Sequence, residues 1–205
     1  MVIQMEIMNY LIIIVLGYLI GSVPFALIVG KLFYNKDIRE SGSGNLGGTN
    51  AGRTLGKKAG ATVMVLDIAK AFIAITIATI IINHFNMNVD PNICGLAVVF
   101  GHCYPVFAGF KGGKGVATAA GFILAINPIL VVIALVILVI NLKIHHMMSL
   151  AVIVTLVLVT VLAYTVGYFD NTKIMLSILT VFITFQHRDN IKRILDGTES
   201  KITFI

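Results

Sequence analysis

The sequence has few charged residues and little cysteine, and both shortages narrow the class of protein. Only 12% of its 205 residues are charged and 58% are hydrophobic, whereas roughly a quarter of the residues in soluble domains are charged. The bilayer is therefore the expected solvent of this chain. The two cysteines, Cys94 and Cys103, lie in or beside one apolar run without disulfide-scaffold spacing, so we expect packing residues and no cross-link.

Two further absences exclude other classes. The apolar stretch from Leu11 to Leu16 is not preceded by basic residues and not followed by a clear small-residue cleavage site, so we expect a retained span rather than a secretory signal. The net charge is +6, but the lysines and arginines lie between hydrophobic runs and are not interleaved with exposed aromatic residues. This pattern argues against nucleic acid and favours a membrane surface or an anionic substrate.

Seven apolar runs are expected to cross the membrane. A helix needs about 20 mainly apolar residues to span roughly 30 Å of hydrocarbon, and fewer where it leans on neighbouring protein. The runs cover residues 9–33, 61–83, 93–109, 115–126, 128–142, 149–167 and 173–186. The predicted fold class is an all-α integral membrane protein, with residues 1–205 forming a single domain.

The number of spans depends on the dipeptide Asn127-Pro128, which is either a kink in one long helix or a turn between two short ones. A turn places the polar segments 40–60, 110–115 and 187–193 on one side of the membrane and leaves Lys173 as the only outer basic residue. The positive-inside rule favours that arrangement. We therefore predict the turn, an outer N-terminus and a cytoplasmic C-terminus.

The first polar segment, residues 41–53, reads Ser-Gly-Ser-Gly-Asn-Leu-Gly-Gly-Thr-Asn-Ala-Gly-Arg. Its glycines allow positive φ and a close approach of the backbone to an anion, while Arg53 can bind a phosphate through two hydrogen bonds. The neutral hydrogen-bonding candidates are Ser43, Asn45, Thr49 and Asn50. A flexible connecting loop is the alternative, but the chemical variety of the segment favours a phosphate-binding loop.

The second polar segment, residues 101–118, contains Lys111-Gly112-Gly113-Lys114 just before a predicted helix. Two cations and the positive end of a helix dipole converge there, which favours an anion. The segment is not a Walker A loop, because it lacks that spacing and follows no strand. Lysines that merely anchor a tight turn on the inner side are the alternative.

The third polar segment, residues 187–201, follows the last span. His187 and Asn190 are three residues apart, so an imidazole and an amide are expected on one helical face at the membrane boundary. A short amphipathic helix is the alternative that this segment alone favours. No metal site is predicted, since His145-His146 has no third ligand in view. Asp67 and Lys70 are expected to form an ion pair within the second span.

Together the three segments resemble the bacterial acyl-phosphate:glycerol-3-phosphate acyltransferase (PlsY) family. The family patterns GSGNxGATNxxR, GHxxPVFxxFKGGKGVAT and HxxNIxRLxxGxE correspond here to GSGNLGGTNAGR, GHCYPVFAGFKGGKGVAT and HRDNIKRILDGTE. The resemblance covers nearly the whole chain, and all three patterns in order are highly specific. The departures are Gly48 for the usual alanine, Leu46 for proline or valine, and Gln186 for an arginine that often precedes the final histidine.

The resemblance implies a multi-pass enzyme of the bacterial inner (plasma) membrane, without cofactor or metal, whose active site faces the cytoplasm. It would transfer a fatty acyl group from acyl phosphate to the 1-hydroxyl of glycerol 3-phosphate, giving 1-acylglycerol 3-phosphate and phosphate, the first acylation of phospholipid synthesis. By similarity, Ser43, Arg53, His187 and Asn190 match catalytic positions and Glu199 a mainly structural carboxylate. The segment Lys111-Gly112-Gly113-Lys114 matches the glycerol-phosphate site.

The residues fit this chemistry. An acyl phosphate already carries a good leaving group, so a site that binds both phosphates and aligns the hydroxyl with the acyl carbonyl requires no protein nucleophile. Whether His187 or a substrate phosphate takes the proton stays open. No histidine is followed by aspartate five residues later, which favours an acyl-phosphate donor over a thioester. A transporter or channel for an organic phosphate, or a non-catalytic membrane scaffold, are the competing functions.

Overall fold

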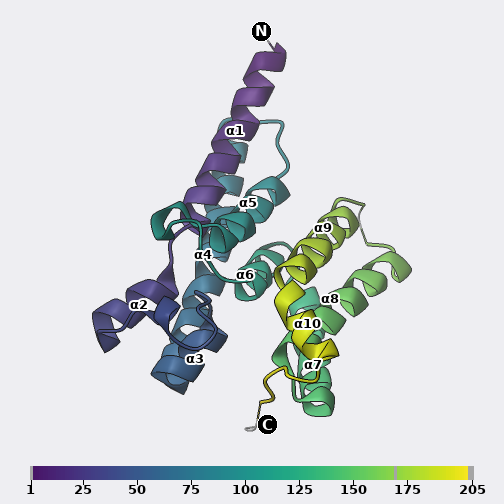
Figure 1. The fold of residues 1–205 in the computed structure, drawn as a ribbon. Helices are drawn as coiled ribbons and strands as arrows, with labels where there is room; N and C mark the ends of the chain where they lie inside the picture. Colours follow the sequence, from purple (N-terminus) through teal and green to yellow (C-terminus); the bar gives the residue numbers. More distant parts are fainter. Residues whose placement is uncertain (1, 169, 203–205) are drawn as a thin grey trace. The chain divides into compact units, whose positions relative to one another are not determined.

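A computed structural model describes residues 2–168 and 170–202, and within those residues every regular element is helical (Figure 1). The all-α fold class is therefore confirmed. The chain separates into two compact units, Met1–Ile126 and Asn127–Ile205. The elements of the first unit are α1 (Val2–Gly21), α2 (Phe25–Tyr34), η1 (Ile38–Glu40), α3 (Gly48–Leu55), α4 (Lys57–His84), α5 (Asn92–Cys103), η2 (Val106–Ala108) and α6 (Val116–Ile126). Those of the second unit are α7 (Pro128–His145), α8 (Met148–Thr165), α9 (Asp170–Gln186) and α10 (Arg188–Leu195).

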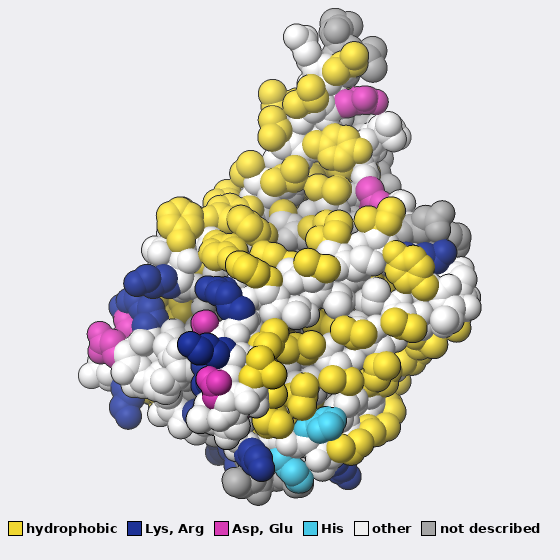
Figure 2. Space-filling model, turned by 45° about the vertical axis from the view of Figure 1, so that its right-hand side comes forward, with side chains coloured by type: hydrophobic (Ala, Val, Ile, Leu, Met, Phe, Trp, Pro, Cys, Tyr) yellow, Lys and Arg dark blue, Asp and Glu magenta, His cyan; other side chains and the backbone are white. Residues whose placement is uncertain are grey.

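Among the described residues, four helical stretches are long and apolar enough to cross a membrane: Ile3–Tyr34, α4, α7 and α8. Helices α5, α6 and α9 have 12, 11 and 17 residues and match three further predicted runs. Figure 2 shows apolar side chains over much of the visible surface. Large exposed apolar residues such as Val65, Ile80 and Val181 would be unfavourable in water, which supports a membrane environment. Seven crossings stay a prediction.

The predicted first span, residues 9–33, is interrupted. Helix α1 ends at Gly21 and α2 begins at Phe25, directly after Pro24. Proline lacks an N–H group, its ring clashes with the preceding turn, and it disfavours helical conformation in the residue before it. The break leaves the carbonyl group of Val23 without a place in a helix ladder, and that carbonyl accepts a bond from Lys70.

Helix α4 is the centre of the first unit, where it contacts α1, α2, α3, α5 and α6. Glycines make the closest crossings possible. A Cβ atom on Gly121 of α6 would overlap the carbonyl oxygen of Ile68 on α4, and one on Gly21 of α1 would overlap that of Val98 on α5. Small residues of this kind let helix backbones approach without side chains between them. The short helix α6 therefore packs directly on α4.

The crossing of α3 over α4 gives an asymmetric prediction. A Cβ atom on Gly60 would lie 2.7 Å from the Cα atom of Gly52 and 2.9 Å from the carbonyl oxygen of Gly48, whereas one on Gly52 would meet nothing closer than 3.7 Å. Gly60→Ala should therefore destabilise the protein by about 1–3 kcal/mol through overpacking against backbone. Gly52→Ala should be neutral or slightly stabilising, because alanine favours helix. Thermal unfolding in detergent compares them, and equal effects would contradict the observed crossing.

In the second unit α8 contacts both α7 and α9. Asn127 lies outside the helical region, and its Oδ1 accepts a hydrogen bond from the Leu130 N–H (3.2 Å), so it caps a new helix that begins at Pro128. The helix is thus broken at the predicted position, and the reversal there stays a prediction. Helices α7 and α8 are joined by His146, in the left-handed region, and Met147. The Ile202 N–H donates to the His146 carbonyl (2.7 Å), which holds the C-terminal segment at that connection.

Candidate functional site

The first polar segment is more ordered than a loop. The short helix η1 precedes it, and the eight-residue helix α3, which was not predicted, begins within it at Gly48. Gly42 and Gly44 between them have φ values of 61° and 70°, a region that glycine adopts without steric cost. The turns that they form bring residues 38–45 back over α3, so the segment is folded onto the surface of α4.

Asn50 holds this folded segment together. Its side chain is only 2% exposed. Its Nδ2 group contacts the carbonyl oxygens of Ile38, Ser41 and Asn45, each at 3.1 Å, and its Oδ1 accepts from the Ser43 N–H at 2.9 Å. The amide thus bonds to the backbone of the segment itself, in contrast to the expected phosphate ligand. Asn50 therefore shapes the loop from within, beside the buried side chains of Leu46 and Ala51.

Three of the predicted side chains are exposed on this segment: Ser43, Thr49 and Arg53. Asn45 is half-buried, and its Nδ2 lies 3.5 Å from the Ser43 Oγ. Thr49 and Arg53 are four residues apart on α3 and so lie on one side of that helix. Arg53 forms no ion pair with any carboxylate in the part of the chain that the structure describes. Its guanidinium is therefore available to an external anion.

Arg39 shows the opposite arrangement nearby. Its guanidinium contacts both carboxylate oxygens of Asp37, the shortest contact being 2.6 Å. The hydrogen bond from Arg39 lowers the pKa of Asp37 well below its usual range, and the same bond raises the pKa of Arg39. Both groups lie near the surface, so the pair adds little stability. Arg39 already has its counter-ion, unlike Arg53.

We use the name glycine-lysine turn for residues 110–115, which the structure joins to the first segment. The Gly112 N–H donates to the Cys103 carbonyl (3.1 Å) and the Gly113 N–H to the His102 carbonyl (3.2 Å). The Gly112 carbonyl accepts from the Leu46 N–H (3.3 Å). Leu46 and Gly112 lie more than 60 residues apart in the sequence, and their bond brings the two polar segments together at one place.

The glycines of this turn are required for close packing. A Cβ atom on Gly112 would overlap the carbonyl oxygen of His102, and one on Gly113 would overlap the His102 side chain. Their N–H groups are bonded within the protein, so the turn offers an anion its lysines. Lys111 is exposed and Lys114 is half-buried, and α6 begins two residues after Lys114 with the positive end of its dipole.

The third segment forms α10 and a C-terminal stretch in the second unit. His187 stands just before α10 and is 4% exposed. Its Nδ1 lies 2.8 Å from the Ile183 carbonyl oxygen. A carbonyl can only accept, so Nδ1 is the donor and Nε2 is the basic nitrogen of the neutral ring. Asn190, also buried, donates from Nδ2 to Glu199 Oε1 (2.6 Å).

Glu199 connects this segment to the rest of its unit. Oε1 also accepts from the Ser149 hydroxyl (2.7 Å) on α8, and Oε2 accepts from Arg193 Nε (2.8 Å) on α10. Burial by itself raises the pKa of Glu199, but the hydrogen bonds from Ser149, Asn190 and Arg193 outweigh burial and lower it below its ordinary value of 4.5. The carboxylate has the contacts of a structural support for Asn190.

This lowered pKa predicts an acid-dependent stability. A carboxylate with a depressed folded-state pKa stabilises the fold fully above its unfolded value of about 4.5, and the stabilisation is lost as the pH falls from there through the folded pKa. Glu199→Gln should cost about 1–3 kcal/mol near pH 7. It should also make the melting temperature less sensitive to acidification below pH 4.5 than in the parent. Equal acid sensitivity in both proteins would contradict the assignment.

The structure adds one polar residue that the sequence reading missed. Asp67 and Lys70 form the predicted ion pair, with 2.8 Å between Nζ and Oδ1, and His102 joins them through Nδ1 at 3.0 Å from the same Nζ. The Gly101-His102 dipeptide at the start of the second segment marks a polar residue on a short apolar helix. The sequence does not show that this histidine contacts Asp67 and Lys70 on α4.

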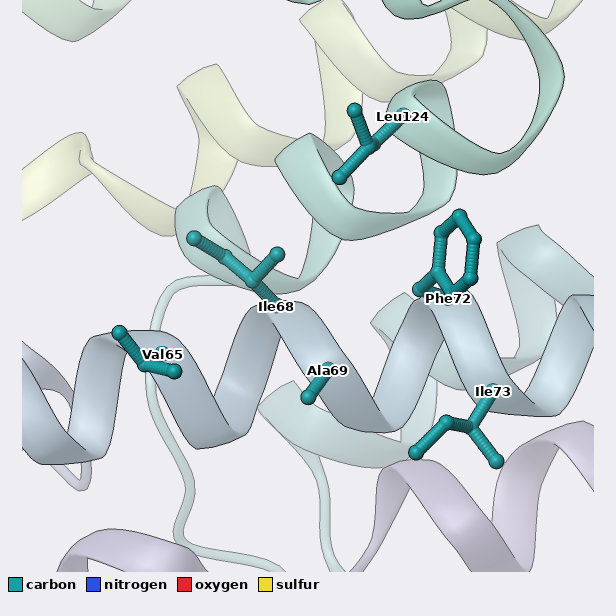
Figure 3. Close-up of a pocket in the computed structure, with 6 residues that line it drawn as sticks. All are labelled: Val65, Ile68, Ala69, Phe72, Ile73 and Leu124. Carbon is teal, nitrogen blue, oxygen red and sulfur yellow. The ribbon is translucent and has the colours of Figure 1, made fainter.

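An apolar groove lies beside these features on the first unit. Figure 3 shows side chains of α4 with Leu124 of α6 around it. Its volume is about 400 Å³, and its lining residues are Val65, Ile68, Ala69, Phe72, Ile73 and Leu124. Five of these six residues lie on α4, so the groove runs along the side of that helix.

Comparison with solved structures defines the class first. Two crystal structures of PlsY, an integral membrane glycerol 3-phosphate acyltransferase, are similar to this chain, in a glycerol 3-phosphate form and a lysophosphatidic acid form. The first has 37% sequence identity and a TM-score of 0.85, covering 95% of this chain and 96% of that one. The second has 36% identity and a TM-score of 0.84, covering 95% of each chain. The protein is an integral membrane protein of this fold.

Sequence comparison then gives the family. The family model described as Glycerol-3-phosphate acyltransferase matches residues 11–197. Glycerol-3-phosphate acyltransferase 2 of Bacillus anthracis is 46% identical over 190 residues, covering 92% of this chain and 97% of that protein. The chain belongs to the glycerol-3-phosphate acyltransferase family, which is the PlsY family that the three motifs indicated.

Proposed function

We propose that the protein transfers a fatty acyl group from acyl phosphate to the 1-hydroxyl of glycerol 3-phosphate, giving 1-acylglycerol 3-phosphate and phosphate. The single observation that carries this proposal is the junction between Leu46 and Gly112, which unites the loop bearing Arg53 with the turn bearing Lys111. Both substrates carry a phosphate group, and each of the two segments joined there carries at least one cation. The two similar PlsY structures are a glycerol 3-phosphate form and a lysophosphatidic acid form, which correspond to the acceptor and the product of this reaction.

The proposed phosphate contacts follow from exposure and charge. Arg53 and Lys111 are exposed cations, and Lys114 stands beside the N-terminus of α6. These three would neutralise the phosphates, with Ser43 and Thr49 donating hydroxyl hydrogen bonds. Asn45 completes this set, whereas Asn50, Gly112 and Gly113 act on the shape of the loop and the turn. No metal or cofactor is part of the proposal.

The proposed reaction needs no covalent enzyme intermediate. The 1-hydroxyl oxygen of glycerol 3-phosphate attacks the acyl carbonyl carbon, the bond from that carbon to the phosphate oxygen breaks, and phosphate leaves with the bonding electrons. His187 would orient the hydroxyl through Nε2, since Nδ1 is committed to Ile183. The proton goes to Nε2 or to a substrate phosphate. Asn190, held by Glu199, would position the same substrate group.

The acyl chain has a proposed place in the groove along α4. Every lining residue is apolar, as a fatty chain requires. Val65 and Ile73 are eight residues apart on α4, which corresponds to about 12 Å of helix. A donor whose phosphate binds near α3 could lay part of its chain along this surface. Together these assignments treat the chain as one acyltransferase domain.

We also propose seven spans with an outer N-terminus, a cytoplasmic C-terminus and an active site on the cytoplasmic face of the bacterial inner membrane. The C-terminal segment is bonded at His146, near Lys143 at the end of α7, which fits one location for both. A reporter fused after Lys143 and another after Ile205 should both be cytoplasmic. Opposite locations would refute the proposed topology.

A donor comparison tests the proposed activity. Purified protein is given glycerol 3-phosphate with palmitoyl phosphate, palmitoyl-CoA or palmitoyl-acyl carrier protein, and lysophosphatidic acid is measured. Only palmitoyl phosphate should support product formation. Product from a thioester at an equal rate would refute the acyl-phosphate donor and leave the acceptor assignment standing.

A further inference from the structure

A buried charged cluster lies against the glycine-lysine turn and has no part in the roles proposed above. Asp67 and Lys70 of α4 and His102 of α5 are 1%, 5% and 6% exposed. Lys70 Nζ lies 2.8 Å from Asp67 Oδ1 and 3.0 Å from His102 Nδ1, and Nδ1 lies 3.4 Å from the same Oδ1. Ionisable groups inside a membrane bundle are costly and commonly serve a function.

Lys70 ties together parts of the chain that are far apart. Its ammonium donates to the Val23 carbonyl (3.0 Å), which the break between α1 and α2 leaves outside a helix. The same ammonium reaches α5 through His102. One side chain on α4 thus fixes the helix break and the end of α5, whose His102 and Cys103 carbonyls hold the glycine-lysine turn.

The contact with Lys70 also defines the state of the imidazole. Lysine has donors only, so Nδ1 of His102 accepts and the ring proton resides on Nε2. The Nε2 edge faces the turn, because a Cβ atom on Gly113 would overlap this nitrogen. The His102 carbonyl accepts from the Gly113 N–H as well. Gly113 is therefore held against both the side chain and the backbone of His102.

We propose that Asp67, Lys70 and His102 are positioning residues that hold the glycine-lysine turn in the geometry that binds the phosphate of glycerol 3-phosphate. The inference rests on the proposed function. The cluster acts through Gly113 on the turn, and through Gly112 and Leu46 on the first segment. Losing it should weaken acceptor binding in the ground and transition states alike, so the KM for glycerol 3-phosphate rises while kcat is retained.

The decisive variant is Asp67→Asn combined with Lys70→Met, which removes both charges at similar volume and leaves no unpaired buried charge. Its KM for glycerol 3-phosphate should rise by about tenfold or more, with kcat and the KM for palmitoyl phosphate changing by less than about threefold. Thr79→Val is the matched control, since Thr79 is a polar residue of the same helix whose hydroxyl bonds to Ile75 within α4 (2.8 Å). Its kinetic constants should equal those of the parent.

Two variants of His102 test the same positioning role if the double variant does not fold. Asparagine can present its Oδ1 to the Lys70 ammonium near the place of Nδ1, so His102→Asn should keep a KM for glycerol 3-phosphate well below that of His102→Leu. A folded double variant with parental KM, or equal KM values for the two His102 variants, would overturn the inference. A parent protein without turnover of glycerol 3-phosphate would instead refute the proposed function.

Discussion

Replacing His187 by alanine is expected to lower kcat by about 10²–10⁴-fold, the usual contribution of a side chain positioned on the proton that is transferred. The reason is the committed Nδ1, which leaves Nε2 as the basic nitrogen of a ring that is 4% exposed. The measurement is the initial rate of phosphate release from palmitoyl phosphate with saturating glycerol 3-phosphate. The KM for glycerol 3-phosphate should change far less than kcat.

Two variants separate this effect from a loss of folding. His187→Asn can keep the hydrogen bond to the Ile183 carbonyl and suits the position before α10, yet it has no group in the place of Nε2. It should melt near the parent and remain as inactive as the alanine variant. His145→Ala removes an imidazole at the end of α7 and should keep parental activity. An active His187→Asn protein would contradict the role of Nε2.

Replacing Arg53 by alanine should lower kcat/KM by about 10²–10³-fold, the range for loss of a group that stabilises developing charge. Arg53 is exposed, and within the described residues it forms no ion pair. Arg53→Lys should recover only part of the loss, because lysine cannot make the paired hydrogen bonds of a guanidinium. The measurement is kcat/KM for both substrates.

Arg39→Ala is the matched control for Arg53. It removes an arginine from the same part of the first unit, but one whose guanidinium is already bound to the Asp37 carboxylate. Its kcat/KM should stay within about threefold of the parent, since an exposed ion pair contributes little. Equal losses in the two variants would mean that general positive charge, rather than Arg53 itself, supports activity.

Much of the fold follows from the sequence because apolar runs and helix breakers are local signals. Most helices lie within a few residues of the predicted limits, and Asn127-Pro128 interrupts the helix where expected. The exceptions are the first run, which is divided at Pro24, and the third, whose helix α5 already ends at Cys103. Helix α3 was missed, since four glycines and two asparagines within residues 44–52 predict a loop. It forms because Gly48 of α3 and Gly60 of α4 have no side chains to keep the two helices apart, a tertiary effect that outweighs helix propensity.

The sequence predicts which residues form the candidate site better than it predicts what each of them does. Glycine, lysine and arginine clusters mark an anion site through charge alone, and Arg53 and Lys111 are exposed as that requires. Asn50 could not be assigned, because its amide bonds to Ile38, twelve residues away. His102 was overlooked since its partner Lys70 lies 32 residues earlier in the sequence. Such contacts depend on how helices pack, which local patterns do not encode.

The most direct test of the account is the stoichiometry of one reaction. Purified protein in detergent receives palmitoyl phosphate and glycerol 3-phosphate, and released phosphate and lysophosphatidic acid are both quantified. The account predicts one phosphate for each lysophosphatidic acid and neither product when glycerol 3-phosphate is omitted. Phosphate release without lysophosphatidic acid, or no turnover with the Arg53→Ala and His187→Ala variants indistinguishable from the parent, would contradict it.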